Sequence, residues 1–272
     1  MSKAEVLREL RSSLAFVERN FNLSRRYLGW ELVFLVYTIV NSVSIGLIGV
    51  GAPGIEADPR LVLYLLTGAL LWSFLSVVFS EVGQAVQWER WEGTIEYTFM
   101  APIHLITYLG GNCLWAVAYA SLRTAILLAA VAAFFRLDLT GANLGGAGVV
   151  LAVAGLSFIG LGLMASVLPL LSTEKGAQAT NIFQAALLLV SGVYYDVSAL
   201  PGWLRPLAYV SPGTYTLRAT RAALIDGAPT EALMGDVAIL LGMAAFFIPV
   251  GFWVFRAGAR YAMRHGKLKR NG

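Results

Sequence analysis

The chain has 272 residues, of which 58% are hydrophobic and only 13% are charged, with a formal net charge of +4. About a quarter of the residues in soluble domains are charged, so this composition excludes an ordinary soluble enzyme or binding domain and indicates a polytopic membrane protein. The net charge does not indicate a nucleic-acid partner, because the basic residues flank the apolar segments.

The segment 1–26 combines basic side chains with a row of apolar side chains at spacings of three and four. The row consists of Leu7, Leu10, Leu14, Val17 and Phe21. This pattern predicts an amphipathic elbow helix lying at a membrane surface. Two roles are open for it: an anchor attracted to anionic lipid, or an anchor that also docks on a partner in the cytoplasm.

Six apolar segments are long enough to cross a bilayer, since a span needs about 20 mostly apolar residues. The predicted spans are 27–51, 60–82, 104–135, 143–171, 178–198 and 233–256. Lysine and arginine cluster before the first span and in a basic tail over 257–272, which places both termini in the cytoplasm. We therefore expect an all-α polytopic fold in which 1–272 forms a single transmembrane domain.

The region 83–103 after the second span carries an acidic motif. On one continuous helix, Glu89, Glu92 and Glu96 share a face, and the tryptophans beside them lie on another. This predicts an amphipathic helix with its carboxylates turned outward. Because the cytoplasmic membrane surface is negative, such a stripe suits a basic groove on a protein partner. The alternative is a plain solvated face.

Chemistry-bearing side chains within the spans are few. Arg123 falls inside the third span, where a charge costs about 2.5–3.5 kcal/mol on insertion scales. We expect it either to snorkel to the outer interface or to form an ion pair with Asp196 or Asp138. Four amides suit either a pathway lining or interhelical hydrogen bonds: Asn41, Gln178, Asn181 and Gln184. Two histidines and a lone cysteine form no metal or catalytic motif.

The connection 199–230 is too apolar for a solvated loop and too rich in proline and glycine for a straight span. We expect an outer re-entrant helical pair whose irregular backbone is shielded by protein. An ordinary interfacial loop anchored by aromatic side chains is the alternative. The predicted gate residues are Tyr194, Tyr195, Pro201, Trp203, Pro212 and Tyr215.

These motifs, in this order, resemble the permease subunit of ABC-2 type exporters. That family often shows a Glu-Arg-x-x-Gly-Thr-x-Glu stretch followed by proline after the second span, and Ser-Gly, Leu-Pro-x-Trp-Leu, Pro-x-Thr-Tyr and an arginine near the end. The first motif is matched by Glu89, Arg90, Gly93, Thr94, Glu96 and Pro102. The later motifs are matched by Ser191-Gly192, Leu200 to Leu204, Pro212 to Tyr215, and Arg218 or Arg221.

The resemblance implies that 83–103 is a coupling helix region seated in a separate ATP-binding subunit. The implied interface residues are Glu89, Arg90, Glu92, Gly93, Thr94, Glu96 and Pro102. The chain has no Gly-x-x-x-x-Gly-Lys-[Ser/Thr] loop, so ATP and Mg²⁺ are expected in two copies of that subunit. The resemblance also implies a second permease copy, as a homodimer, surrounded by the lipid of a bacterial plasma membrane. It implies no catalytic residue and no metal site in this chain.

The function implied is ATP-driven export of an amphipathic small molecule, drug or lipid-type substrate. A permease for lipid-linked polysaccharide is the nearest alternative. An ion-coupled secondary transporter is a second class, although it usually needs carboxylates near the membrane midplane. An intramembrane enzyme would need a nucleophile with a base, or a metal cluster, at membrane depth.

Overall fold

The computed structural model describes residues 3–51, 59–137, 140–172 and 175–266. Every regular element in these residues is helical. The long elements are α1 (Lys3–Arg26), α2 (Leu28–Val50), α3 (Pro59–Glu92), α5 (Leu105–Phe135), α6 (Leu144–Ala165), α8 (Lys175–Ser191) and α11 (Thr230–Arg264). The short elements are α4 (Ile95–Met100), α7 (Val167–Leu171), η1 (Val197–Ala199), α9 (Arg205–Val210) and α10 (Pro212–Leu224).

Five helices of the described chain are long and apolar enough to cross a membrane: α2, α3, α5, the combined α6 and α7, and α11. The segment predicted as a further span, 178–198, corresponds to α8, which has 17 residues. That length gives about 26 Å of helix, slightly short of the roughly 30 Å hydrocarbon core. The all-helical membrane fold is thus confirmed, and the count of six spans stays a prediction.

Two predicted boundaries differ from the helices of the structure. The second span continues as α3 to Glu92, so the region predicted to begin at residue 83 starts as the last turns of that helix. The last span continues as α11 to Arg264, into the region predicted as a basic tail. The end of that tail, 267–272, lies outside the described residues.

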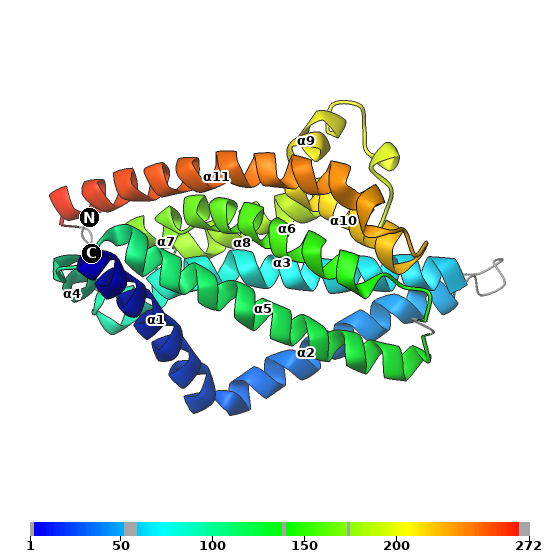
Figure 1. The fold of residues 1–272 in the computed structure, drawn as a ribbon, viewed down its shortest axis with the longest axis horizontal. Coiled ribbons are helices and arrows are strands. Elements are labelled where there is room, and N and C mark those ends of the chain that lie inside the picture. Colours follow the sequence, from blue (N-terminus) through cyan, green and yellow to red (C-terminus); the bar gives the residue numbers. More distant parts are fainter. Residues whose placement is uncertain (1–2, 52–58, 138–139, 173–174, 267–272) are drawn as a thin grey trace.

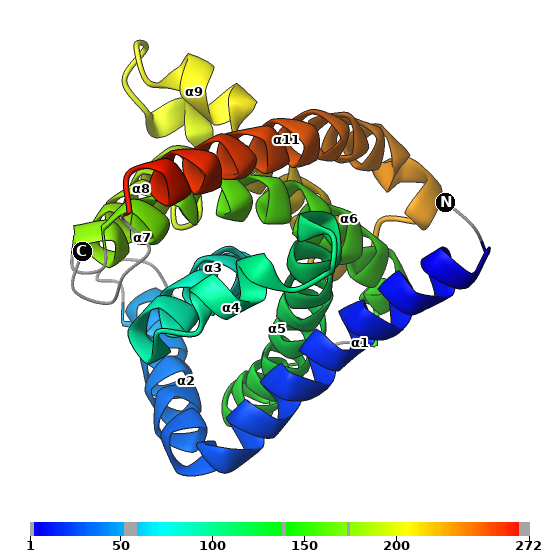
Figure 2. The same cartoon turned by 90° about the vertical axis from the view of Figure 1, so that its left-hand side faces the viewer.

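The helices form an elongated bundle with α3, α6 and α11 along its length (Figure 1). Helix α4 and both termini lie at one end, named here the α4 end, while α9 and α10 lie away from it. Viewed from the α4 end, α1 runs obliquely past α5 and meets α2 at a corner of the bundle (Figure 2). The α4 end is therefore built by α1, α4, α7 and the last turns of α11.

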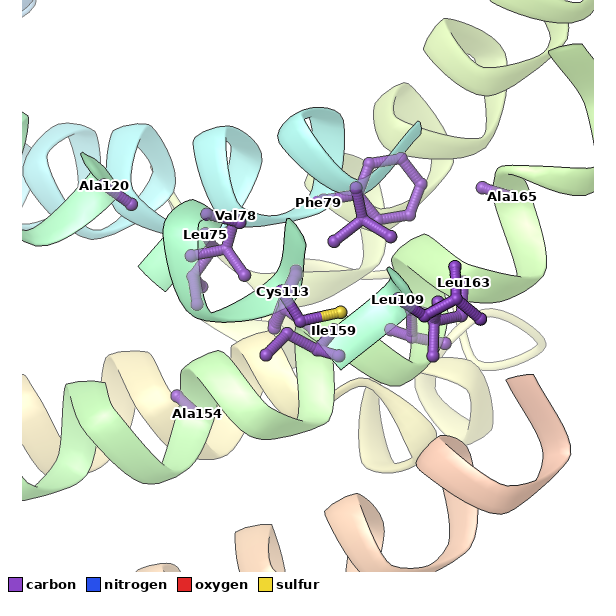
Figure 3. Packing of buried hydrophobic residues seen from close by; sticks show 14 of the residues in the cluster. Leu75, Val78, Phe79, Leu109, Cys113, Ala120, Ala154, Ile159, Leu163 and Ala165 are labelled. Atoms are coloured by element: carbon purple, nitrogen blue, oxygen red, sulfur yellow. The ribbon is translucent and has the colours of Figure 1, made fainter. Parts of the chain in front are cut away.

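The central core joins α3, α5, α6 and α11. Figure 3 shows Leu75, Phe79 and Ile159 packed around the buried Cys113. Helices α6 and α11 approach at their backbones: a Cβ on Gly160 would lie 2.5 Å from the carbonyl carbon of Phe247. Because lipid tails supply no hydrophobic drive for helix association, such small-residue contacts and their dispersion energy hold membrane bundles together.

The ion pair expected between Arg123 and Asp196 does not form. The Arg123 guanidinium donates to the Tyr119 hydroxyl at 3.3 Å and to Thr38 Oγ1 at 3.4 Å. Asp196 instead accepts the Ser198 backbone N–H at 2.8 Å and caps η1. The expectation was wrong because local hydroxyl groups on α2 and α5 satisfy the arginine. The other candidate partner, Asp138, lies outside the described residues.

Candidate coupling site

Helix α3 ends at a glycine turn rather than continuing through the acidic motif. Gly93 has φ +74°; its N–H donates to Arg90 O at 3.2 Å, and the Thr94 N–H donates to Glu89 O at 2.8 Å. This pair of bonds is a Schellman motif, in which glycine takes the left-handed conformation at little steric cost. The prediction of one continuous helix through Glu96 is therefore wrong, and α4 is a separate element of six residues.

Glu89 is buried, with 2% of its surface exposed. Its Oε1 lies 2.5 Å from Nη1 of Arg19, which reaches it from α1. The prediction of an outward-facing carboxylate stripe is wrong for this residue, because its carboxylate is buried and pairs with Arg19 of α1. Glu92 and Glu96 are exposed as expected from the pattern.

Arg90 is also buried, with 1% exposed, and points to a different element. Its Nη1 donates to Leu170 O at 2.6 Å and to Pro169 O at 3.2 Å. Carbonyls in the last turn of a helix have no intrahelical donor, and a cation there also suits the helix dipole. Two adjacent residues thus tie the end of α3 to both α1 and α7. We call this pair with its partners, Arg19, Glu89, Arg90, Pro169 and Leu170, the clamp.

Helix α1 is further fixed to the first turns of α5. The Glu9 carboxylate accepts the backbone N–H of His104 at 3.4 Å and the Thr107 hydroxyl. His104, the N-cap of α5, makes no capping bond with its own side chain, so Glu9 supplies the acceptor that this helix start lacks. The hydroxyl of Thr107, followed by the His104 N–H, holds the pKa of Glu9 below its ordinary value.

Farther along α1, small and polar groups allow a close approach to α5. The Asn20 amide donates to Asn112 Oδ1 at 2.8 Å, and Phe16 meets Tyr108 edge-on with ring centroids 5.3 Å apart. A Cβ on Gly111 would lie 2.5 Å from Ser13 O, so a glycine is needed there. The leucines of the apolar row, Leu7, Leu10 and Leu14, remain exposed on the opposite side.

The outer surface of this region mixes acidic and apolar groups. Tyr97 and Met100 of α4 are 76% and 78% exposed, and Trp91 at the end of α3 is exposed beside them. We call these three residues, together with Glu92 and Glu96, the coupling surface. Large exposed apolar side chains rimmed by charge are typical of a protein-interaction site. Of the predicted interface, Pro102 is exposed, Gly93 and Thr94 form the turn, and Glu89 and Arg90 lie behind the surface.

Two grooves run along α3. One, with a volume of about 310 Å³, separates the last turns of α3 from α8. Its ten lining residues carry no charge and include Gln84, Gln87, Trp88, Thr180 and Asn181. The other, of about 210 Å³, lies against α2 and is lined by hydroxyl and amide groups. Its lining includes Thr38, Asn41, Ser42, Ser73, Ser76 and Tyr194.

The predicted gate residues lie in and around η1, α9 and α10. Pro212 is the first residue of α10, where its fixed φ suits a helix start. The Tyr215 hydroxyl donates to Tyr209 O at 3.0 Å, and the Tyr195 hydroxyl donates to Leu189 O. Both tyrosines thus bind backbone carbonyls six residues earlier in the chain. Pro201 and Trp203 are exposed. The structure thus spreads the six predicted residues over separate contacts rather than joining them in one cluster.

Sequence reasoning did not identify Glu9 or Arg19 as parts of the site. A weak signal existed, because Glu9, Ser13, Phe16 and Asn20 form a second row on α1 at helical spacing. The leucine row beside it dominates the pattern, and no local feature of Arg19 distinguishes it from the other arginines of this segment.

The described residues thus form a helical membrane bundle with an exposed surface at the α4 end and with grooves along α3 whose lining residues are uncharged. The model of the ABC-2 type transporter family matches residues 13–225, which is most of the chain. The chain therefore belongs to the ABC-2 type transporter family, as the motifs indicated. It is the membrane component, which has no ATPase activity of its own, and the family implies an ATP-binding subunit as partner. Among curated proteins, no match to the chain was found.

Proposed function

We propose that this chain is the permease subunit of an ATP-driven exporter and works as a homodimer with two ATP-binding subunits. The observation that carries the proposal is the clamp. Its buried Glu89 and Arg90 side chains connect the exposed coupling surface to Arg19 of α1 and to carbonyls of α7. In this arrangement both termini and the α4 end face the cytoplasm of a bacterial plasma membrane. ATP and Mg²⁺ are held by the partner subunits.

The clamp gives a physical route for force. A partner that moves the coupling surface moves the end of α3, and the bonds of Glu89 and Arg90 carry α1 and α7 with it. Pulling Arg19 away would leave the buried Glu89 carboxylate unpaired, at a cost of about 3–5 kcal/mol, so the connection resists small displacements. Because Glu9 fastens α1 to the start of α5, four elements shift together.

The lining of the larger groove supports a proposal about the chemistry of the substrate. The larger one combines tryptophan with amide and hydroxyl groups and has no charged lining residue, which suits an amphipathic molecule that stacks and hydrogen-bonds. Its volume of about 310 Å³ lies at the lower end of the roughly 300–1,000 Å³ typical of small-molecule sites. A second copy facing this groove would enclose the pathway. We propose a drug- or lipid-type substrate, with lipid-linked polysaccharide as the alternative.

The first test is affinity purification of the tagged chain from its native membranes in mild detergent, with mass spectrometry of stoichiometric partners. We expect an ATP-binding protein in equimolar amount. Candidate drugs, lipids and lipid-linked sugars are then compared for stimulation of the ATPase activity of the complex. Absence of a nucleotide-binding partner, even after cross-linking, overturns the proposal.

A second test reverses the exposed charges only. The double variant Glu92→Lys with Glu96→Lys should lose the ATP-binding partner while keeping its yield and its elution volume. The matched control is Asp226→Lys with Glu231→Lys, which reverses two exposed carboxylates far from the α4 end. Equal recovery of the partner by all three proteins would show that the acidic residues are only a solvated face.

A further inference from the structure

Arg221 of α10 reaches into the packing between three segments. Its Nη2 donates to Val193 O at 2.5 Å and to Tyr64 O at 3.5 Å, and its Nη1 donates to Gly192 O at 3.2 Å. Its Cζ also lies 3.5 Å from the centroid of the Tyr64 ring. A single side chain therefore binds α10, the turn after α8 and the first turns of α3.

The backbone around this guanidinium is shaped by glycines. A Cβ on Gly68 of α3 would lie 2.1 Å from Val193 O and 2.9 Å from Nη2 of Arg221. Gly192 has φ +70°, which turns two successive carbonyls toward the arginine. Any side chain at Gly68 would therefore displace the turn from α3.

The Arg221 guanidinium donates its hydrogen bonds to backbone carbonyls of the turn and of α3, which has a consequence for motion. The bonds to Gly192 O and Val193 O exist only while the turn is seated beside α10 and α3. The charge is stabilised in this apolar region by those carbonyls and by the face of the tyrosine ring. Behind the turn, Val193, Leu217 and Leu71 form a small buried cluster.

Helix α10 carries a second arginine with a different anchor. Arg218, three residues earlier, pairs with Asp236 of α11 through its guanidinium. Helix α10 is thus held to α11 by the Arg218–Asp236 pair, and to the turn and α3 by the bonds of Arg221. Loss of Arg221 would free the α3 side while the α11 side stays attached.

We propose that Arg221 is the latch of the outer gate: it holds α10 and the turn at residues 191–193 against α3 in the closed state. Opening toward the outside requires its guanidinium to leave the two turn carbonyls. Arg221 is in this sense a positioning residue, because it controls a backbone turn rather than touching substrate. The assignment of the gate to export rests on the proposed function, whereas the latch itself is a property of this chain.

The test uses a buried cysteine reporter. Cys113 is the single cysteine of the chain, so Cys113→Ala gives a cysteine-free background, and Val193→Cys then places a thiol at a position with 0% exposure. The backbone carbonyl that Arg221 binds is kept. The rate of reaction with a membrane-impermeant maleimide is measured on the purified chain in nanodiscs, without the ATP-binding subunit.

Arg221→Met should raise the maleimide rate by about tenfold or more, the factor expected from losing one hydrogen bond to a charged group. Arg221→Lys keeps the charge but not the planar fork and should give an intermediate rate. Arg218→Met, the matched control, should change the rate by less than about twofold, because it leaves the bonds from Arg221 to the turn in place. A rate for Arg221→Met equal to that of the parent, in protein with a normal elution volume, overturns the latch.

A second variant covers the case in which Arg221→Met does not fold. Gly68→Ala keeps the arginine but pushes against Val193 O, so it should also raise the labelling rate. Gly242→Ala on α11, where an added Cβ meets nothing within 4 Å, is its control. Equal rates for these two alanine variants refute the latch. Neither labelling measurement involves ATP. The absence of an ATP-binding partner would therefore overturn the exporter proposal without affecting the test of the latch.

Discussion

Removing Arg19 should destabilise the chain more than removing Glu89, although Glu89 is the more buried of the two. The Arg19 side chain is 37% exposed and that of Glu89 is 3% exposed. Arg19→Ala leaves a buried carboxylate without its cation, which costs about 3 kcal/mol or more. Glu89→Ala leaves an arginine that reaches water, so the loss is about 1 kcal/mol, as for an exposed pair.

The double variant should therefore be about as stable as Glu89→Ala alone, with a coupling free energy of about 3 kcal/mol. The assay is a double-mutant cycle on thermal or denaturant unfolding of the purified chain in one detergent. In the complex with its ATP-binding partner, Arg19→Ala should keep ATP hydrolysis and lose most of its stimulation by substrate. Equal costs for the two single variants, or a coupling free energy below about 0.5 kcal/mol, would refute the reasoning about the clamp.

Three further predictions concern neighbouring contacts. Arg90→Met should lower the thermal midpoint because the Pro169 and Leu170 carbonyls lose their donor; a midpoint equal to that of the parent would contradict this. Gly93→Ala should cost about 1–2 kcal/mol, because its φ of +74° is strained for a residue with a Cβ; Gly235→Ala, in open space, is the control. The stabilisation by Glu9, whose pKa is lowered by Thr107 and the His104 N–H, should be fully present above about pH 4.3 and lost as the pH falls through the lowered pKa. The difference in unfolding midpoint between the parent and Glu9→Gln should accordingly shrink in acid, and a difference independent of pH would speak against that role.

The sequence alone was sufficient for the class of protein. Composition and the long apolar segments required a helical membrane bundle, because only helices satisfy their own backbone hydrogen bonds in lipid without closing into a barrel. The order of short motifs around Glu89 and Pro212 was sufficient for the family. The helix break after Glu92 was also encoded locally, in Gly93, but helical spacing of the glutamates concealed it.

The tertiary structure decided which of those motif residues face a partner and which face the interior. Glu89 and Glu96 have the same chemistry and lie on one helical face by spacing alone, yet the first is buried in an ion pair with Arg19 of α1 and the second is exposed. Likewise, Arg218 and Arg221 are equivalent in sequence, but one faces Asp236 and the other faces the turn after α8. Periodicity describes one helix at a time, whereas burial depends on which distant segment packs against it, and that is fixed only when the whole bundle has assembled.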